Sequence, residues 1–373
     1  MNQSGQPEIN VCEISAFKIP TEMKESDGTL EWEETVMVLV SLEAGGNAGI
    51  GFTYADASAA NFIVNNFPKI ILGQNPLNIE QLHHNMHKSI RNNGNCGIAF
   101  MALSAVDIAL WDLKAKLLNL PLANLLGQRT ESIQVYGSGG FTSYSEKELT
   151  QQFENWVEQG FKQVKMKIGR EPSKDIERIR IARESIRPET ALFVDANGAF
   201  TVKQAIKTAG KFEKYNVEWF EEPVSSDNLD GLSFVKNHVP AGVNIAAGEY
   251  GYDLPYFRKL VESEAIDVLQ ADATRCGGIT GFLKAGHLAE AYHLPFSFHC
   301  APSVHLHAAL SLPGFFTGEY FFDHVKIEER LFDGFKKPDN GYLSPDLSMP
   351  GLGLQLKTTE AEKYKIFHKH LNN

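Results

Sequence analysis

The stretch "QVKMKIGREPSKDIERIRIARESIRPETALFVDAN" (163–197) guides the fold prediction, because it has the pattern of a strand, a helix and a second strand. Apolar runs at 163–168 and 191–197 flank a segment at 174–187 that has the character of an amphipathic helix. Two strands joined through a helix are typical of a parallel β/α unit. The same pattern recurs on both sides of this stretch.

Two lysines lie one residue apart in the first of these strands. Successive side chains of a strand point to opposite faces, so Lys165 and Lys167 share one face while Val164 and Met166 occupy the other. One interpretation is an edge strand with its lysines in water, which is common. The other is a buried strand with a charged face, and the rest of the sequence favours it.

From about residue 130, short apolar strands alternate with amphipathic helices, and strand starts recur at intervals of about 20 to 30 residues. Eight parallel strands with crossover helices predict a closed TIM-type barrel. A doubly wound open sheet is the alternative, but its usual glycine-rich motif is missing, since "GSGG" (137–140) lacks the spacing. The predicted strands lie at 133–139, 163–168, 191–197, 218–223, 244–249, 268–274, 295–300 and 315–320.

The residues before the barrel have a different pattern. Residues 35–54 predict an antiparallel hairpin, and residues 99–127 predict helices, so this part has an α+β character. The turn-rich segment after the barrel is expected to pack back on the first domain. The predicted divisions are an α+β domain over 1–129, a barrel over 130–330 and a C-terminal segment over 331–373.

Composition restricts the class of protein. The chain has 35 basic and 46 acidic residues and a net charge of -11, which argues against a nucleic-acid or anionic-membrane surface. Its four cysteines form no CxxC pair, so neither a disulfide framework nor a structural zinc site is indicated. The N-terminal stretch lacks a signal-peptide pattern, and no apolar run is long enough to span a membrane. We expect a cytoplasmic protein that binds neither nucleic acid nor membrane.

In barrels of this type, functional side chains lie at the carboxyl ends of the strands. Ionisable residues occur at or near the end of seven successive predicted strands, beginning with the second. They are Lys165 and Lys167, Asp195, Glu221, Glu249, Asp272, His299 and Glu319.

Three of these residues predict a metal site. Asp195, Glu221 and Glu249 follow successive strands, so barrel closure would bring three carboxylates together. Each alone has a structural explanation, as a turn residue, a helix start or a solvated rim charge. Three carboxylates in one place need a cation, and hard oxygen ligands that leave positions for water and substrate suit Mg²⁺ rather than zinc.

The remaining residues predict proton transfer. A histidine among apolar neighbours, as in "SFHC" (297–300), is usually a packed core residue, but Asp272 on the preceding strand would fix the tautomer of His299 and raise its basicity. Lys167 would face His299 from the other side of a substrate. Glu319 is either a structural acid or a hydrogen-bond partner of a substrate carboxylate.

Eight motifs along nearly the whole chain resemble the enolase superfamily, and specifically its mandelate racemase subgroup. Other branches place a lysine at the end of strand six, where "LQADAT" (269–274) has Asp272 instead, and this departure favours the histidine-bearing branch. The motifs are "SAVDIALWDLKAK", "VKMKIG", "VDANG", "WFEEPV", "AGE", "DATRCGGIT", "SFHCAPSVHLHAA" and "PGLGL".

The resemblance implies a capping domain, made of the N-terminal sheet and helices plus the C-terminal tail, over a modified (β/α)7β barrel. It also implies the site roles: Mg²⁺ bound by Asp195, Glu221 and Glu249; a substrate carboxylate held by Lys165; acid or base chemistry by Lys167 and the His299–Asp272 dyad; and a hydrogen bond donated by Glu319. A lysine or histidine base acting beside Mg²⁺ is the chemistry known for the superfamily as a whole.

The expected reaction begins with removal of the proton α to a carboxylate, for which the pKa of Lys167 would have to be lowered. Mg²⁺ and Lys165 would stabilise the resulting enediolate. Loss of a β-hydroxyl would then convert a sugar acid to a 2-keto-3-deoxy acid, the preferred prediction. The alternatives are racemisation or epimerisation of a 2-hydroxy acid, and a non-catalytic metal-binding regulator or scaffold.

Substrate specificity is expected to come from two loops, at 20–32 and 54–58, whose polar character mildly favours a polyhydroxylated substrate. Solvated loops without such a role are an equally good interpretation of any one of these residues. We also expect a homo-oligomer acting on a small carboxylate substrate.

Overall fold

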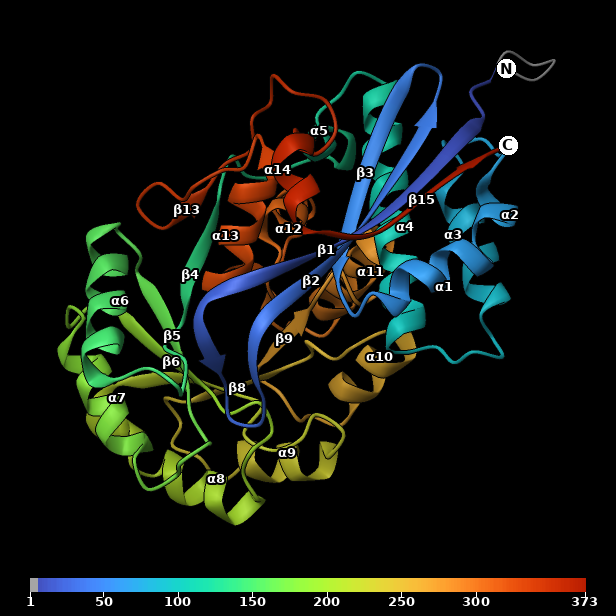
Figure 1. Cartoon of the computed structure of the whole chain (residues 1–373). Coiled ribbons are helices and arrows are strands. Elements are labelled where there is room, and N and C mark those ends of the chain that lie inside the picture. Colours follow the sequence, from blue (N-terminus) through green and yellow to red (C-terminus); the bar gives the residue numbers. More distant parts are fainter. Residues whose placement is uncertain (1–5) are drawn as a thin grey trace.

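Parallel strands close into a barrel in a computed structural model of the chain, which describes residues 6–373 (Figure 1). The strands pair in chain order, and β11 (Phe315–Phe321) pairs with β4 (Ile133–Gly139) to complete the ring. The predicted barrel is therefore confirmed, and the open-sheet alternative is wrong. Between those two strands lie β5 (Gln163–Lys167), β6 (Ala191–Asp195), β7 (Val217–Glu221), β8 (Asn244–Ala247), β9 (Val268–Ala271) and β10 (Phe296–Phe298).

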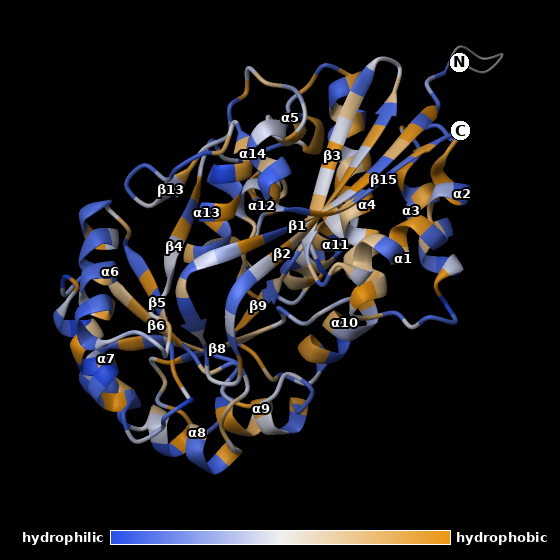
Figure 2. Ribbon diagram, in the orientation of Figure 1, coloured by the Kyte–Doolittle hydropathy of each residue, from blue (hydrophilic) through white to orange (hydrophobic). Residues whose placement is uncertain are grey.

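Helices surround the barrel on its outside (Figure 1). The first of them, α6 (Glu146–Glu158), begins at Ser145, whose hydroxyl accepts a hydrogen bond from the Glu148 amide in a capping box. Hydrophobic and hydrophilic residues alternate along these helices, which bury one face against the strands (Figure 2). The others are α7 (Asp175–Glu184), α8 (Val202–Ala209), the 3₁₀ helix η1 (Phe212–Tyr215), α9 (Leu229–Lys236), α10 (Leu254–Glu262), α11 (Gly278–Ala291), α12 (Pro302–Ala309) and α13 (Phe322–Leu331).

A separate antiparallel sheet forms the cap. Its strands β1 (Ile9–Ser26), β2 (Glu31–Ala44) and β3 (Asn47–Tyr54) are joined by short turns, and the turn after β2 uses Gly45 and Gly46 at positive φ. The predicted hairpin is therefore present. The first five residues of the predicted first domain lie outside the described residues. The cap helices are α1 (Ser58–Asn66), α2 (Pro68–Ile71), α3 (Ile79–Ser89), α4 (Ile98–Leu117) and α5 (Leu122–Leu126).

The end of the chain contributes to both parts. Strand β15 (Lys365–Asn372) pairs with β1 and becomes an edge of the cap sheet, as expected of a segment that packs back on the first domain. Strand β13 (Tyr342–Leu343) instead pairs with β4 of the barrel. The domain boundaries after residues 129 and 330 stay predictions. The other elements here are β12 (Phe332–Asp333), β14 (Gln355–Leu356), α14 (Thr358–Ala361) and the 3₁₀ helix η2 (Glu362–Tyr364).

Helix α4 connects the two hydrophobic cores. Most of its residues are buried, so it is apolar on nearly all sides. Ile108 belongs to the core that surrounds the barrel strands, whereas Leu103 and Leu110 belong to the core between the cap sheet and helices. Burial of this helix on both sides attaches the cap to the barrel.

The hairpin of β1 and β2 reaches across the barrel (Figure 1). The predicted loop at 20–32 is largely strand, because β1 continues to Ser26 and the backbones of Glu25 and Trp32 are paired. Only residues 27–30 form the turn. Gly28 lies so close to the barrel that an added Cβ would come within 2.3 Å of the Ala196 carbonyl oxygen. The segment expected to be a loop is therefore mostly strand, with an irregularity between Pro20 and Glu25, and its role in substrate specificity stays a prediction.

An aromatic layer fills the barrel below its mouth. Phe193 and Trp219 stack with ring centroids 5.0 Å apart, and Tyr136 lies beside both. Phe193 and Trp219 precede Asp195 and Glu221 by two positions each, so they point inward from the same strands. This layer is a rigid apolar base for the charged residues above it.

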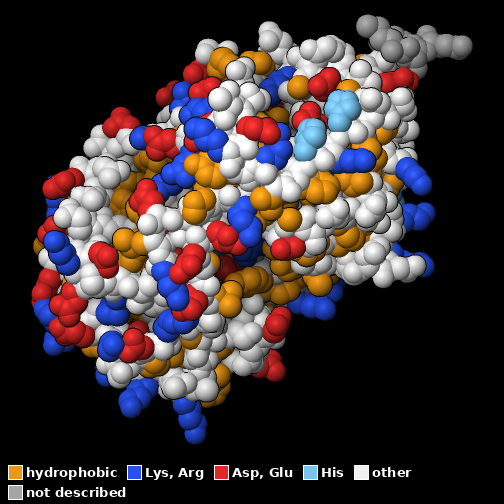
Figure 3. Space-filling model, viewed as in Figure 1, with side chains coloured by type: hydrophobic (Ala, Val, Ile, Leu, Met, Phe, Trp, Pro, Cys, Tyr) orange, Lys and Arg blue, Asp and Glu red, His pale blue; other side chains and the backbone are white. Residues whose placement is uncertain are grey.

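The surface view in Figure 3 shows acidic and basic side chains interspersed over the barrel and the cap on that face. Over residues 6–373, the structure contains no helix that is long and apolar enough to cross a membrane.

Candidate active site

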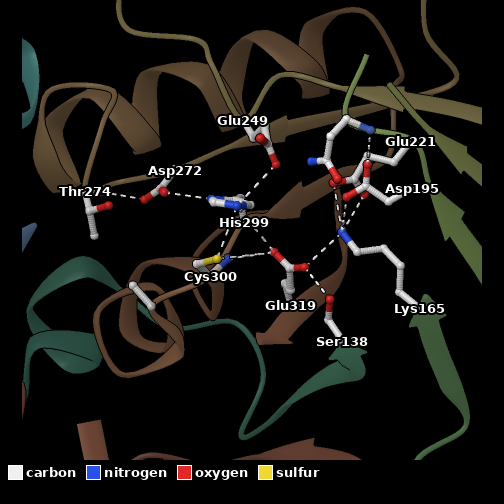
Figure 4. Close-up of polar contacts among 12 residues, drawn as sticks. Ser138, Lys165, Asp195, Glu221, Glu249, Asp272, Thr274, His299, Cys300 and Glu319 are labelled. Carbon is white, nitrogen blue, oxygen red and sulfur yellow. Dashed lines mark hydrogen bonds and ion pairs between the residues drawn. The ribbon is translucent and has the colours of Figure 1, made fainter. Parts of the chain in front are cut away.

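The strand ends bring the predicted ionisable residues into one buried group (Figure 4). Lys165 and Lys167 lie on β5, Asp195 ends β6 and Glu221 ends β7. The others follow β8, β9 and β10 by one or two residues or lie on β11. All eight are less than one-tenth exposed, and they are Lys165, Lys167, Asp195, Glu221, Glu249, Asp272, His299 and Glu319.

The two lysines of β5 both enter the barrel interior. Lys165 is 0% exposed and Lys167 is 4% exposed, while Val164 and Met166 pack in the core against the helices. The edge-strand interpretation is therefore wrong. The strand is buried on both faces, one apolar and one charged.

The carboxylates of Asp195, Glu221 and Glu249 form an acidic triad in which each offers an oxygen within 4.8 Å of the others. Strand register explains part of this, because Asp195 and Glu221 are paired directly across β6 and β7. Glu249 follows Gly248, whose φ of 133° is open to glycine but rarely to other residues.

The carboxylate oxygens of the triad are suitable ligands for a hard divalent cation. Oε2 of Glu249 is buried and accepts no hydrogen bond from the described residues, and it lies 3.2 Å from Nε2 of His299. Burial, followed by the charge of Asp195, raises the pKa of Glu221 well above its usual range. A cluster of buried carboxylate oxygens with an unsatisfied member has the character of a magnesium site.

Lys165 makes a network of ion pairs at the centre of the group. Its Nζ lies 2.7 Å from Oε2 of Glu221, 2.9 Å from Oε1 of Glu319 and 3.6 Å from Oδ2 of Asp195. Burial lowers the pKa of Lys165, but the charges of Glu221 and Glu319 outweigh it and keep the pKa well above the usual value. The ammonium therefore neutralises carboxylates from three different strands.

Lys167 donates to Oδ2 of Asp195 at 2.5 Å. Burial lowers its pKa, yet the charges of Asp195, Glu319 and Glu249 together outweigh burial and the repulsion from Lys165, so the net pKa is raised. Action of Lys167 as a base would need a lowered pKa. In the metal-free protein the surrounding carboxylates raise it instead.

His299 and Asp272 form a hydrogen-bonded pair on the opposite wall, with Nδ1 of the ring 2.8 Å from Oδ2 of Asp272. Oδ1 of Asp272 accepts from the Thr274 amide at 2.7 Å, which fixes the carboxylate. Burial raises the pKa of Asp272, but the hydrogen bond from His299 and the neighbouring positive charges together outweigh burial and lower the pKa. An ionised Asp272 holds the proton on Nδ1 and leaves Nε2 facing the site.

Glu319 lies between Lys165 on one side of the site and His299 on the other (Figure 4). Its Oε1 accepts from the Ser138 hydroxyl at 2.6 Å, and its Oε2 accepts from the Cys300 amide at 3.0 Å. Burial raises its pKa, but the charge of Lys165, together with His299, Lys167 and the Ser138 hydrogen bond, outweighs this and holds the pKa well below the usual value. In this state Glu319 accepts hydrogen bonds, so the donor role implied by the family would require it to take up a proton.

Backbone strain is concentrated at the same strand ends. Asn197, Glu222, Cys300 and Ala301 all have φ between 36° and 50°, in the left-handed region that costs energy for residues other than glycine. Oδ1 of Asn197 and Oε1 of Glu222 are buried without a hydrogen-bond partner among residues 6–373. Such features are common at functional sites.

Some contacts of the site were not predicted from the sequence. Ser138 binds Glu319, Cys300 lies with Sγ 3.1 Å from Nε2 of His299, and Arg275 approaches Glu249 and Asp272 at 3.7 and 3.6 Å. The signal for Ser138 was its position on the first barrel strand, which closes against the last. Cys300 and Arg275 stood inside recognised motifs, but their contacts depend on chain folding after the strands end.

Comparisons with known proteins agree with the barrel and its cap. The protein family described as "Enolase C-terminal domain-like" matches residues 148–361. The family described as "Mandelate racemase / muconate lactonizing enzyme, N-terminal domain" matches residues 11–127. L-talarate/galactarate dehydratase of Salmonella typhimurium is 34% identical over 72% of this chain and 68% of its own length.

Two solved structures are also similar. A mandelate racemase/muconate lactonizing enzyme-like protein from Rubrobacter xylanophilus has a TM-score of 0.94 and 47% identity, over 96% of this chain and 99% of its own. A racemase from Streptomyces coelicolor A3(2), solved with bound magnesium, has a TM-score of 0.90 and 28% identity, over 96% of this chain and 100% of its own.

Proposed function

The chain belongs to the mandelate racemase subgroup of the enolase superfamily, and we propose that it is a Mg²⁺-dependent dehydratase that converts a sugar acid to a 2-keto-3-deoxy acid. The observation that carries the proposal is the meeting of two groups in one barrel mouth. One is the acidic triad with its lysines, and the other is the hydrogen-bonded pair of His299 and Asp272. Similarity to a sugar-acid dehydratase supports the choice of substrate class.

Asp195, Glu221 and Glu249 would hold the Mg²⁺ ion. The unsatisfied Oε2 of Glu249 supports this assignment, as does the bound magnesium of the similar racemase. When bound, the cation supplies positive charge that stabilises the negative charge formed on the substrate carboxylate. The carboxylate set contains only oxygen donors, which suits Mg²⁺.

Lys165 would bind the substrate carboxylate. Its ammonium group is fixed by Glu319 and Glu221 and lies above the aromatic layer, with Nζ 5.2 Å from the centre of the Tyr136 ring. A charged donor already oriented in a dry site stabilises developing negative charge without further reorganisation.

Lys167 and His299 would transfer the protons. One of them takes the α-proton, and the electron pair of the broken C–H bond moves onto the carboxylate as an enediolate. The other donates a proton to the β-hydroxyl, the C–O bond breaks and water leaves. The resulting enol becomes the keto acid. The face on which the α-proton lies decides which of the two acts as the base.

Racemisation or epimerisation of a 2-hydroxy acid is the second candidate. Lys167 contacts Asp195 on the β5–β6 side and His299 contacts Asp272 on the β9–β10 side, so the two proton carriers occupy different walls. That arrangement allows a proton to be removed from one face and returned to the other. A similar structure described as a racemase favours keeping this candidate.

Incubation with a panel of sugar acids in Mg²⁺, with and without EDTA, tests the proposal. We expect release of a keto acid that requires Mg²⁺ and disappears in the chelator. Exchange of the α-proton with solvent deuterium without keto-acid release would replace the dehydratase by the racemase. Absence of both reactions across a broad panel would favour the non-catalytic regulator or scaffold, although the intact contacts of Lys167, Asp272 and His299 argue against it.

Two further predictions concern the setting of the enzyme. We propose a cytoplasmic location, which agrees with four cysteines that form no disulfide within residues 6–373. We also propose a homo-oligomer. Cell fractionation tests the first prediction, and light scattering of the purified protein tests the second.

A further inference from the structure

A second set of possible metal ligands lies beside the acidic triad. Nε2 of His299, Sγ of Cys300 and an oxygen of Glu319 lie within 4.8 Å of one another (Figure 4). Sγ is 3.1 Å from Nε2, Oε2 of Glu319 is 3.6 Å from Sγ, and the same oxygen is 3.8 Å from Nε2. None of these three residues belongs to the triad.

These separations suit a tetrahedral cation. Zinc bond lengths to sulfur, nitrogen and oxygen imply ligand-to-ligand distances of about 3.4–3.6 Å, so a bound ion would need shifts of about half an ångström or less. Imidazole and thiolate are preferred by zinc and related cations, whereas Mg²⁺ takes oxygen ligands. We propose that His299, Cys300 and Glu319 bind Zn²⁺ or a similar borderline-soft divalent cation, separately from the Mg²⁺ site.

The surrounding contacts already orient the three ligands. Asp272 accepts from Nδ1 of His299 at 2.8 Å, which is the carboxylate–histidine arrangement that fixes metal-binding histidines. Ser138 and Lys165 hold Oε1 of Glu319 at 2.6 and 2.9 Å, while Oε2 accepts from the Cys300 amide at 3.0 Å and faces the other two ligands.

Two observations on neighbouring atoms support a cation in this position. Cys300 has a φ of 50°, and this turn after β10 places its Sγ 3.1 Å from Nε2 of the preceding residue. Oε2 of Glu249, which belongs to the acidic triad, lies 3.2 Å from the same Nε2, so the negative charge of the triad borders this position. Nitrogen, sulfur and carboxylate oxygen atoms therefore surround the position proposed for the cation.

Binding would follow simple coordination chemistry. The Cys300 thiol loses its proton to the solvent, and a metal–sulfur bond forms as the S–H bond breaks. Three protein ligands leave the fourth tetrahedral position for water. Because Nε2 is the atom with which His299 would carry a proton, a bound cation blocks that transfer. This last consequence rests on the proposed function, whereas the binding itself does not.

Cadmium titration in excess Mg²⁺ tests the site, because only a metal–thiolate bond gives the near-ultraviolet charge-transfer absorption and the acidic triad contains no sulfur. The starting protein is Cys96→Ser, which removes the exposed thiol. We expect one cadmium–thiolate per chain. Cys300→Ala should abolish the absorption, while the matched buried control Cys276→Ala should keep it. Absorption that survives in Cys300→Ala, or its absence from the starting protein, overturns the proposal.

Two measurements keep the test decisive if Cys300→Ala does not fold. Asp272→Asn should weaken Zn²⁺ binding about 10- to 100-fold in competition with a coloured chelator, and unchanged affinity would count against the site. Crystals of the unmodified protein soaked with Zn²⁺ and Mg²⁺ should show anomalous scattering between His299, Cys300 and Glu319, and a peak at the triad alone would overturn the proposal. Both measurements remain valid if no sugar acid is turned over, so failure of the proposed function is recognised separately.

Discussion

The barrel mouth and the contacts of helix α4 both bury carboxylates away from water. On α4, Asp107 accepts from the Thr280 amide at 3.0 Å and from the Thr280 hydroxyl at 2.7 Å. Asp112 accepts from the amides of Ile50 and Leu352, both at 2.7 Å, and thus connects the cap sheet to the C-terminal segment. Both side chains are 0% exposed, as are Asp195 and Glu221 in the mouth.

The difference between the regions lies in what satisfies the carboxylates. Each oxygen of Asp107 and Asp112 has a hydrogen-bond donor from a neighbouring element, and these contacts hold the cap on the barrel. In the mouth, carboxylates crowd together, Lys165 neutralises several at once, and Oε2 of Glu249 has no donor among the described residues. A buried charge therefore does not by itself identify a site, whereas a convergent set with an unsatisfied atom does.

Removal of Asp112 should have the largest effect on stability. Asp112→Ala leaves the buried amides of Ile50 and Leu352 without an acceptor and should lower the free energy of unfolding by about 3–5 kcal/mol. Urea denaturation measures this change. The folded fraction should keep its catalytic rate, since Asp112 makes its contacts in the cap. A loss below about 1 kcal/mol would contradict the structural role assigned to this carboxylate.

Substitution in the barrel mouth should lower activity and leave stability nearly unchanged. Glu221→Gln should lower α-proton exchange by about 10²- to 10³-fold, equivalent to about 3–4 kcal/mol, and should weaken Mg²⁺ binding measured by calorimetry. Burial and the charge of Asp195 already raise the pKa of Glu221, so the metal-free protein should lose little stability. If this variant unfolds as readily as Asp112→Ala while keeping its Mg²⁺ affinity, the two regions do not differ as described.

The stability contributed by Asp107 should depend on pH. Burial raises the pKa of Asp107 to about 7 against a usual value of 3.8, so the folded protein holds this proton more tightly than the unfolded chain. Stability from this group is therefore complete below about pH 4 and is lost as the pH rises toward 7. Between pH 5 and 7 the loss should be about 2 kcal/mol.

Asp107→Asn mimics the protonated side chain and provides the control. Its free energy of unfolding should fall less over that pH range than the wild-type value, with both proteins measured in chelator. Parallel curves for the two proteins would show that Asp107 keeps its charge when folded.

Removal of an exposed ion pair should have the smallest effect on stability. Lys18 and Glu34 lie 2.6 Å apart with side chains about half exposed, at 43% and 52%. Lys18→Met should change the free energy of unfolding by less than about 1 kcal/mol, because water and salt screen the pair. A larger loss in the same urea assay would mean that cap charges matter more than their exposure suggests.

Particular residues show how far prediction from the sequence can reach. Lys165 and Lys167 are predictable on one charged face of a strand, and Asp195 and Glu221 at neighbouring strand ends, because side-chain alternation and strand–helix order are local patterns. The pairing of Ser138 with Glu319 cannot be derived in the same way, since 181 residues separate them along the chain. The extended hairpin at 20–32 escapes prediction because its polar residues resemble a loop, and pairing between β1 and β2 decides its conformation.

The barrel, with acids, lysines and a histidine at successive strand ends, can be read from the amino-acid sequence, because the spacing of apolar residues fixes which side chains turn inward. The contacts between those side chains depend on the folded chain. Folding raises the pKa of Lys167 in the metal-free protein, keeps Glu319 ionised and brings Cys300 against His299. Charge interactions depend steeply on distance and burial, and both are set by chain closure between residues far apart in the sequence.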